Sequence, residues 1–163
     1  ALEVLSAYPV PEDIGYFFGR TPAALFQLDL IRHHNPEDPE ACARVFRNAA
    51  ERHRGSNLDY DPQELPLVEE LLLAALNGGS ENGTRAPILD VLVLGLGCYV
   101  GEVLRRAAPQ SSWRFTEHWS EGLVIEFSSA TADPIGKGQA FLQNGPEVSV
   151  AYYVAYVLKE LNG

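Results

Sequence analysis

The stretch VLVLGLGCYVGEVL at residues 91–104 constrains the fold more than any other part of the chain, because it has two incompatible interpretations. If residues 89–94 form a buried strand, the glycines that follow make a GxGxxxG loop, which holds a pyrophosphate at a helix N-terminus. If the stretch is one helix, the same glycines let another segment of chain approach it closely. These glycines are Gly95, Gly97 and Gly101.

The spacing of the apolar residues favours the helix. From Ile88 onward they recur at i, i+3, i+4 and i+7 and form one wide face, which is typical of a buried helix. A dinucleotide fold also needs strands that alternate with helices. The strand-like segments 113–117 and 123–127 are too close in sequence for a crossover helix between them. In the alternative nucleotide-binding interpretation, Glu117 accepts hydrogen bonds from the ribose.

Capping residues followed by proline predict where several helices begin. A side-chain oxygen at the N-cap with proline at the first helical position is a helix start signal. The residues that give this signal are Thr21, Asp38, Asp61 and Asp133. Together with the apolar stripes that follow, they predict helices over 22–34, 39–54, 62–77 and 88–104, a short element over 134–144, and a C-terminal helix that begins at Pro146.

Two segments alternate apolar and polar residues and predict a β-hairpin. WRFTEHW at 113–119 and LVIEF at 123–127 have period two, and only Ser-Glu-Gly separates them. We therefore expect an α+β fold that is predominantly helical, with five or six helices and one small antiparallel β-hairpin at about 112–128. In this interpretation residues 1–163 form a single compact domain with a flexible loop at about 78–86.

The charge of the chain narrows the classes of partner. Twelve basic residues face 22 acidic ones, so the formal net charge is −10 at neutral pH. Nucleic acids and anionic membranes are disfavoured, because both need a basic surface. No window of about 20 apolar residues predicts a membrane span. The acidity, together with two widely spaced cysteines, favours a cytoplasmic protein, and any protein partner is expected to be basic.

A further set of residues resembles an uncharacterised family of bacterial domains of unknown function. Its members have a helix with an LGxxxGE core, a tryptophan on the strand that follows, and a proline-led segment that ends near Asn-Gly. The resemblance covers roughly residues 94–145, and the matching positions are Leu96, Gly97, Gly101, Glu102, Trp113, Pro134, Asn144 and Gly145. It implies a helical glycine stretch and no activity.

The histidine and cysteine residues that could bind a metal or act in catalysis are better explained by structural roles. His33 and His34 are adjacent, so they point to different faces of a helix and are poorly placed to bind one metal. Cys98 lies in an apolar stretch and is expected to be a core residue, not a nucleophile activated by His118. We therefore predict no catalytic residue, no metal and no cofactor.

The leading functional hypothesis is a non-enzymatic domain that binds another protein, in the manner of an inhibitor, an immunity protein or a chaperone. Aromatic and charged side chains on the hairpin and the last helix form the candidate interaction surface. They are Arg114, His118, Trp119, Tyr152 and Tyr156. Two alternatives stay open. One is a nucleotide-binding enzyme or sensor that uses the glycines of 95–101. The other is a small-molecule binding domain with a pocket between the hairpin and the glycine helix.

Overall fold

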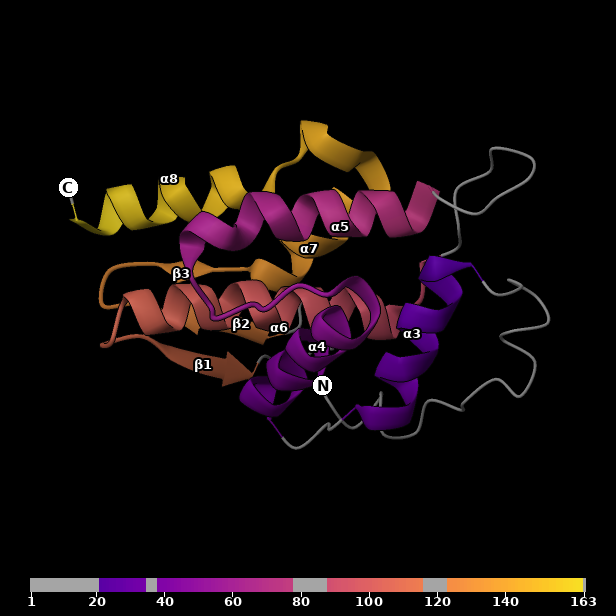
Figure 1. Ribbon diagram of the computed structural model, residues 1–163. Helices are drawn as coiled ribbons and strands as arrows, with labels where there is room; N and C mark the ends of the chain where they lie inside the picture. The colour runs from indigo at the N-terminus through magenta and orange to yellow at the C-terminus, as the bar shows by residue number, and fades with distance from the viewer. Residues whose placement is uncertain (1–20, 35–37, 78–87, 116–122, 163) are drawn as a thin grey trace.

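The computed structural model describes residues 21–34, 38–77, 88–115 and 123–162, and it confirms the predominantly helical α+β fold (Figure 1). The described residues form six α-helices, two short 3-10 helices and a small antiparallel sheet. In chain order these elements are α3 (Pro22–His33), α4 (Pro39–Arg54), η1 (Pro62–Glu64), α5 (Leu65–Asn77), α6 (Asp90–Ala107), β1 (Ser112–Phe115), β2 (Leu123–Glu126), β3 (Thr131–Ala132), α7 (Pro134–Asn144), η3 (Gly145–Glu147) and α8 (Val150–Asn162).

Helix α6 contains the whole glycine stretch and lies at the centre of the molecule (Figure 1). Every residue from Leu94 to Leu104 is buried, since α4, α7, α3 and α8 all pack against this helix. The helix begins at Asp90, two residues after the predicted start. Just before it, the backbone N–H of Leu89 donates a 2.8 Å hydrogen bond to the side chain of Gln27 on α3. The helical interpretation of the stretch is therefore confirmed.

Two glycines of α6 allow close contacts that a side chain would prevent. A Cβ added to Gly97 would lie 2.6 Å from the Cα of Ile135, so the backbone of α7 touches α6 at this point. A Cβ on Gly101 would lie 2.1 Å from the ring of Trp113. On α7, a Cβ on Gly138 would lie 3.5 Å from the backbone nitrogen of Gly97. The close approach predicted from the glycine spacing thus occurs between α6 and α7.

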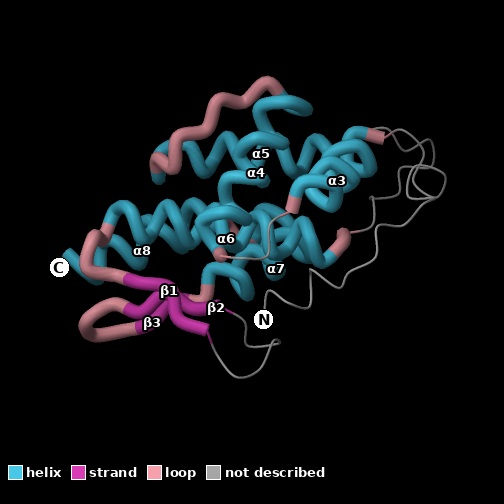
Figure 2. Tube along the Cα trace, turned by 90° about the horizontal axis from the view of Figure 1, so that it is seen from below, coloured by secondary structure: helices cyan, strands magenta, loops and turns pink. Residues whose placement is uncertain are grey.

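The sheet confirms the predicted hairpin and adds a third strand (Figure 2). Strand β2 lies in the middle and pairs antiparallel with both β1 and β3, with Trp113 opposite Ile125. Leu123 and Ile125 of β2 are buried against the helices, whereas Phe115 of β1 is 52% exposed. Among the residues of β1, only Trp113 is therefore partly buried, and the other three are exposed.

Helix α8 begins at Val150 and not at the predicted Pro146, because η3 occupies the residues after α7. Its N-terminus is held from another helix, since the backbone N–H of Val150 donates a 2.9 Å hydrogen bond to Glu69 on α5. The hydroxyl of Ser149 accepts a 3.0 Å hydrogen bond from the N–H of Tyr152. Only Val150 and Val154 of α8 are fully buried.

An ion-pair cluster ties α3 to α4. The carboxylate of Asp29 on α3 accepts 2.9 Å hydrogen bonds from Arg52 Nε and from His53 Nε2 on α4, and its side chain is 11% exposed. Burial alone would raise the pKa of Asp29, but the hydrogen bonds and charges of Arg52 and His53 outweigh burial and lower it. The folded state therefore favours the ionised carboxylate.

Replacing Asp29 with asparagine is expected to lower the free energy of unfolding by about 1 kcal/mol near neutral pH. A carboxylate whose pKa is lowered on folding stabilises fully above its unfolded pKa of about 3.9, and this stabilisation is lost as the pH falls through the folded pKa. The difference between wild type and Asp29→Asn should therefore shrink in acid. Urea denaturation at neutral and acidic pH checks this, with the exposed Asp59→Asn as control. A difference that stays constant with pH contradicts the prediction.

Candidate functional site

The glycine stretch does not form a phosphate-binding loop. Gly95, Gly97 and Gly101 are all buried inside one helix, whereas a phosphate loop presents backbone N–H groups to a ligand. Gly95 faces the side chains of Phe46 and Leu30, and the other two glycines face α7 and Trp113. The nucleotide interpretation needed a strand at 89–94, but residues 90–94 form the first turns of α6. Glu117, its expected ribose ligand, lies outside the described residues.

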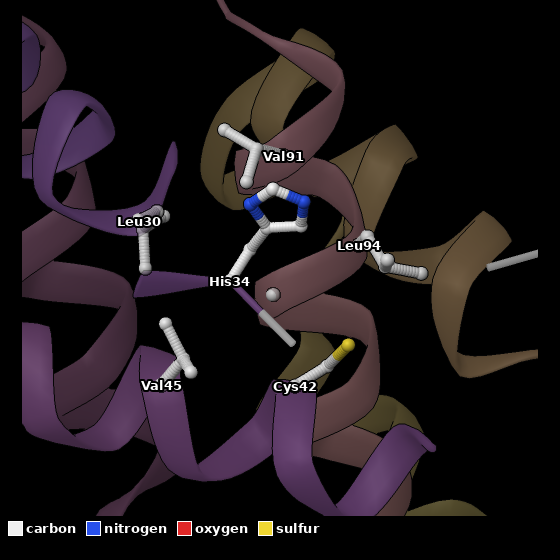
Figure 3. Close-up of a pocket in the computed structure, with 7 residues that line it drawn as sticks. Leu30, His34, Cys42, Val45, Val91 and Leu94 are labelled. Atoms are coloured by element: carbon white, nitrogen blue, oxygen red, sulfur yellow. The ribbon is translucent and has the colours of Figure 1, made fainter. Parts of the chain in front are cut away.

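A small apolar cavity lies beside Gly95, between α3, α4 and α6 (Figure 3). Its volume is about 10 Å³, which is enough for about one water molecule. The imidazole of His34 lies over it, and His34 Nδ1 donates a 2.7 Å hydrogen bond to the carbonyl oxygen of Ile31. The other lining residues are Leu30, Cys42, Val45, Val91 and Leu94. This cavity is a packing space and is too small for a ligand.

Two larger hollows lie along α8 where this helix faces the sheet and the end of α6. We call them together the α8 groove. They meet at Phe127 and Leu161, which line both. The first has a volume of about 220 Å³ and is otherwise lined by Ala107, Ala108, Pro109, Gln110, Ser111, Ser128, Leu158 and Asn162. The second has a volume of about 410 Å³ and is otherwise lined by Ser129, Ala130, Thr131, Tyr153, Tyr156, Val157 and Glu160.

The α8 groove combines apolar walls with one acidic side chain. Glu160 is the acidic residue of its lining, and neither hollow is lined by a described lysine or arginine. Helix α6 ends at Ala107 on the wall of the first hollow, and the C-terminal end of a helix dipole favours a positive charge. Tyr153 is fixed in place, because its hydroxyl accepts a 3.1 Å hydrogen bond from the backbone N–H of Asp133.

The described members of the predicted interaction surface lie on α8 and on β1. Tyr156 is 54% exposed and lines the second hollow, whereas Tyr152 is 73% exposed and lines neither hollow. Arg114 is exposed on β1 and forms a 2.7 Å ion pair with Glu126 on β2. His118 and Trp119 lie outside the described residues.

Most residues that line the groove carry no sequence pattern that predicts a groove. Phe127 was visible as an apolar position of a period-two strand, and Leu161 lies one turn after Val157 on the apolar stripe of the last helix. Both patterns predict burial and not a groove. The groove arises because the turn between β2 and β3 and the last turns of α8 do not close on one another, which no local pattern reports.

Glu102 is a fully buried carboxylate surrounded by donors. It accepts hydrogen bonds from Arg105 Nε at 2.5 Å, from Trp113 Nε1 at 2.9 Å and from Arg106 Nε at 3.5 Å. Burial would raise the pKa of Glu102, but the hydrogen bonds from Arg105 and Trp113 and the charges of both arginines lower it. Because these donors engage both carboxylate oxygens, Glu102 orients its neighbours and does not act as a general base.

Several residues of the family resemblance contact one another or the same neighbours in the structure. Gly101 and Glu102 both contact Trp113, and Gly101 also faces Pro134. Gly97 packs on α7, where Gly138 faces Leu96 in turn. The motif therefore has a packing explanation, in which α6 receives the tryptophan of β1 on one turn and the start of α7 on the next.

Neither cysteine is placed to act as a nucleophile. Cys98 on α6 is completely buried, and burial raises the pKa of its thiol, as does a hydrogen bond with the thiol of Cys42 on α4. A nucleophilic cysteine needs the thiolate and access to a substrate. Cys98 has neither, and its proposed partner His118 lies outside the described residues.

The two adjacent histidines do not form a metal site with each other. His33 contacts Asp29 and His34 contacts the carbonyl of Ile31, so the two histidines serve different partners. No group of three or more His, Cys, Asp or Glu side chains among residues 21–34, 38–77, 88–115 and 123–162 is arranged to hold a metal ion. Within the same ranges no helix has the length and apolarity that a bilayer crossing requires.

Comparison with known proteins adds no family to this description. No family model matches the chain, and no curated protein or solved structure matches it. The resemblance at 94–145 accordingly stays a prediction from the sequence. The α8 groove, with its apolar walls and acidic character, is the feature on which a functional inference rests.

Proposed function

We propose that the protein acts by binding another protein, and that a segment of this partner occupies the α8 groove. The observation that carries the proposal is the pair of hollows that meet at Phe127 and Leu161 and expose apolar side chains along α8. Tyrosine is enriched at protein interfaces because its ring gives contact area at a small entropic cost. Tyr156, half exposed at the edge of the groove, is such a residue.

The chemistry of the groove selects a basic segment with an apolar side chain as its anchor. The apolar anchor is expected to fill the hollow beside Phe127, where few polar groups would lose contact with water. A lysine or arginine next to it would lie near Glu160 and near the C-terminal end of α6. The net charge of −10 over the whole chain accelerates the association of a basic partner. An inhibitor, an immunity protein or a chaperone would each use such a surface.

Site-specific photo-crosslinking tests the proposal. A benzophenone amino acid at position 156 should form a covalent adduct with a basic protein in native lysate, since this position borders the groove. The same amino acid at position 25 is the control, because Leu25 is exposed on α3, outside the lining of the groove. Mass spectrometry of the adduct identifies the partner, and purified partner then gives the affinity.

Charge reversal at the groove distinguishes binding in the groove from attraction of a basic partner by the net charge of the chain. Glu160→Lys should weaken the affinity for the purified partner, whereas Glu70→Lys changes the net charge equally on α5 and should not. Loss of one well-placed charge partner costs about 1 kcal/mol, or roughly five-fold in the dissociation constant. Equal weakening by both variants, or adducts from position 25 alone, contradicts a partner site in the groove.

A small molecule is the second candidate occupant. The larger hollow has a volume of about 410 Å³, within the size range of small-molecule sites, and its hydroxyl-bearing residues are placed to orient a ligand. It lies between α8 and the β2–β3 turn, and not between the hairpin and α6 as the sequence suggested. A ligand there should raise the melting temperature of wild type but not of Val157→Trp, in which the hollow is filled.

A further inference from the structure

Arginines gather around Tyr60 on the face of the molecule formed by α4 and α6. Glu40, Arg44 and Arg47 are spaced i, i+4 and i+7 on α4, so they lie on one side of that helix. The guanidinium of Arg47 lies 5.9 Å from the centre of the Tyr60 ring. The guanidinium of Arg106, at the end of α6, lies 3.7 Å from it. We call these residues the Tyr60 cluster.

Tyr60 has an unusual backbone conformation that places its ring at the centre of this cluster. Its φ is +59°, which is uncommon for a bulky residue and tends to occur where the surrounding structure enforces it. Its N–H donates a 3.0 Å hydrogen bond to the hydroxyl of Tyr99, and the two rings stack with their centres 5.0 Å apart. One face of the Tyr60 ring therefore lies on Tyr99, and Arg106 covers the other.

The arginines are held in position by contacts that leave part of their donor capacity unused. Arg47 uses its Nε to donate to the carbonyl oxygen of Leu58. Arg106 lies between buried Glu102, 3.5 Å from its Nε, and Glu40, 3.9 Å from its Nη2, and its side chain is 42% exposed. Arg44 is exposed and forms no ion pair among the described residues. Each guanidinium has five N–H donors, so several remain available to an acceptor.

The charge of the cluster is opposite to that of the chain. Arg105 and Glu102 neutralise one another at its base. Above them the positive charges of Arg44, Arg47 and Arg106 face Glu40 and Glu64, whose carboxylate accepts a hydrogen bond from the N–H of Asp59 beside Tyr60. Burial raises the pKa of the Tyr60 hydroxyl, and the positive charges of the three arginines oppose this rise. This concentration of arginine stands out in a chain with a net charge of −10.

We propose that the Tyr60 cluster binds an oxyanion of the phosphate class through Arg44, Arg47 and Arg106. Guanidinium donors match the oxygens of phosphate in geometry, and three arginines from two helices can donate to one anion. Both faces of the Tyr60 ring are covered, so the site offers no platform for stacking a base. It recognises the phosphate group and not an attached nucleoside. The site lies on α4 and α6 and is independent of the partner proposed for the α8 groove.

Titration of the labelled protein with pyrophosphate, followed by NMR, tests this inference. The backbone amides of Arg44, Arg47 and Tyr60 should shift together and saturate. Arg44→Gln removes one positive charge from an exposed side chain and should weaken binding by about three-fold to five-fold. Arg32→Gln changes the net charge equally on the exposed surface of α3 and should leave the affinity unchanged.

Three results would overturn the inference. They are the absence of saturable shifts at the cluster, equal weakening by Arg44→Gln and Arg32→Gln, and tighter binding of malonate than of pyrophosphate. Malonate carries its negative charge on two carboxylates, so it tests whether the phosphate geometry matters. Arg106→Gln should abolish binding, and its thermal melt shows whether the fold persists. None of these measurements depends on a protein partner, so this inference and the proposed function fail separately.

Discussion

Gly97→Ala is expected to lower the free energy of unfolding by about 2 kcal/mol, although alanine is the better helix former. The new Cβ would lie 2.6 Å from the Cα and from the Cγ1 of Ile135. A backbone atom cannot turn aside as a side chain can, so α6 and α7 must separate along their contact. Overpacking of this kind costs up to about 3 kcal/mol, and the helical preference of alanine over glycine returns about 1 kcal/mol.

Gly95→Ala is the matched control on the same helix. Its Cβ would lie 3.4 Å from the ring of Phe46 and 3.8 Å from Leu30, which are ordinary contact distances. We expect this variant to be as stable as wild type or up to about 1 kcal/mol more stable. Urea denaturation followed by far-UV circular dichroism measures both variants. If Gly97→Ala proves as stable as Gly95→Ala, the contact between α6 and α7 is not as close as the structure places it.

Glu102→Leu is expected to cost about 3 kcal/mol of stability. It leaves the N–H of Trp113 without its acceptor and leaves Arg105 and Arg106 without the buried carboxylate that holds them. Removing one member of a buried ion pair typically costs about 3–5 kcal/mol, and the lower value applies because both guanidiniums are partly exposed. Denaturant unfolding gives the change in free energy, and Trp113 reports the local change by fluorescence in a Trp119→Phe background.

A control variant and the pH dependence of stability test whether the effect of Glu102→Leu comes from the buried carboxylate. Glu126→Gln removes the charge of an exposed ion pair with Arg114 and should change stability by less than about 1 kcal/mol.

The effect of Glu102 should also depend on pH, because its pKa is lowered in the fold. Its contribution to the free energy of unfolding is present above the unfolded pKa of about 4.3 and is lost as the pH falls through the lower folded pKa. The gap between wild type and Glu102→Leu should narrow in acid. A gap below about 1 kcal/mol at neutral pH would show that Glu102 is not an anchor.

Helix starts were predicted well from the sequence because their cause is local. The side chains of Thr21, Asp38, Asp61 and Asp133 each accept a hydrogen bond from a backbone N–H two or three residues later, as their N-cap positions predict. A capping interaction needs only the residues on either side of it. The start of α8 was wrong for the same reason, because its first N–H is held by Glu69 from a distant helix.

The glycine stretch was interpreted correctly only through the rest of the chain. Its residues alone fit both a phosphate loop and a buried helix, and the absence of further strands decided between them. The structure explains why glycines occupy a helix that they destabilise, since Gly97 and Gly101 admit Ile135 and Trp113. These partners lie far along the chain, so no local pattern identified them.

Neither the groove nor the Tyr60 cluster could be predicted from the sequence, and the reasons differ. The groove is space left between α8 and the β2–β3 turn, and unfilled space has no signature in a sequence. The Tyr60 cluster combines Arg44 and Arg47 from α4 with Arg106 from α6, which lie far apart in the sequence. The net charge of −10 over the whole chain also gives no indication of a local positive cluster. A net charge averages over the surface, whereas a binding site depends on local density.

The first turn of helix α8 is held by the hydrogen bond from Val150 to Glu69, and the later turns of this helix form one wall of the groove. Val150 and Val154 are its only fully buried residues, whereas Val157, Leu158 and Leu161 in the later turns are only partly buried against the core. In hydrogen exchange, the amides of these turns should exchange through local fraying, long before those of α6, whose opening requires global unfolding. We therefore expect the wall of the groove to open at a lower cost in free energy than α6. An occupant of the groove would show itself as slowed exchange of these amides.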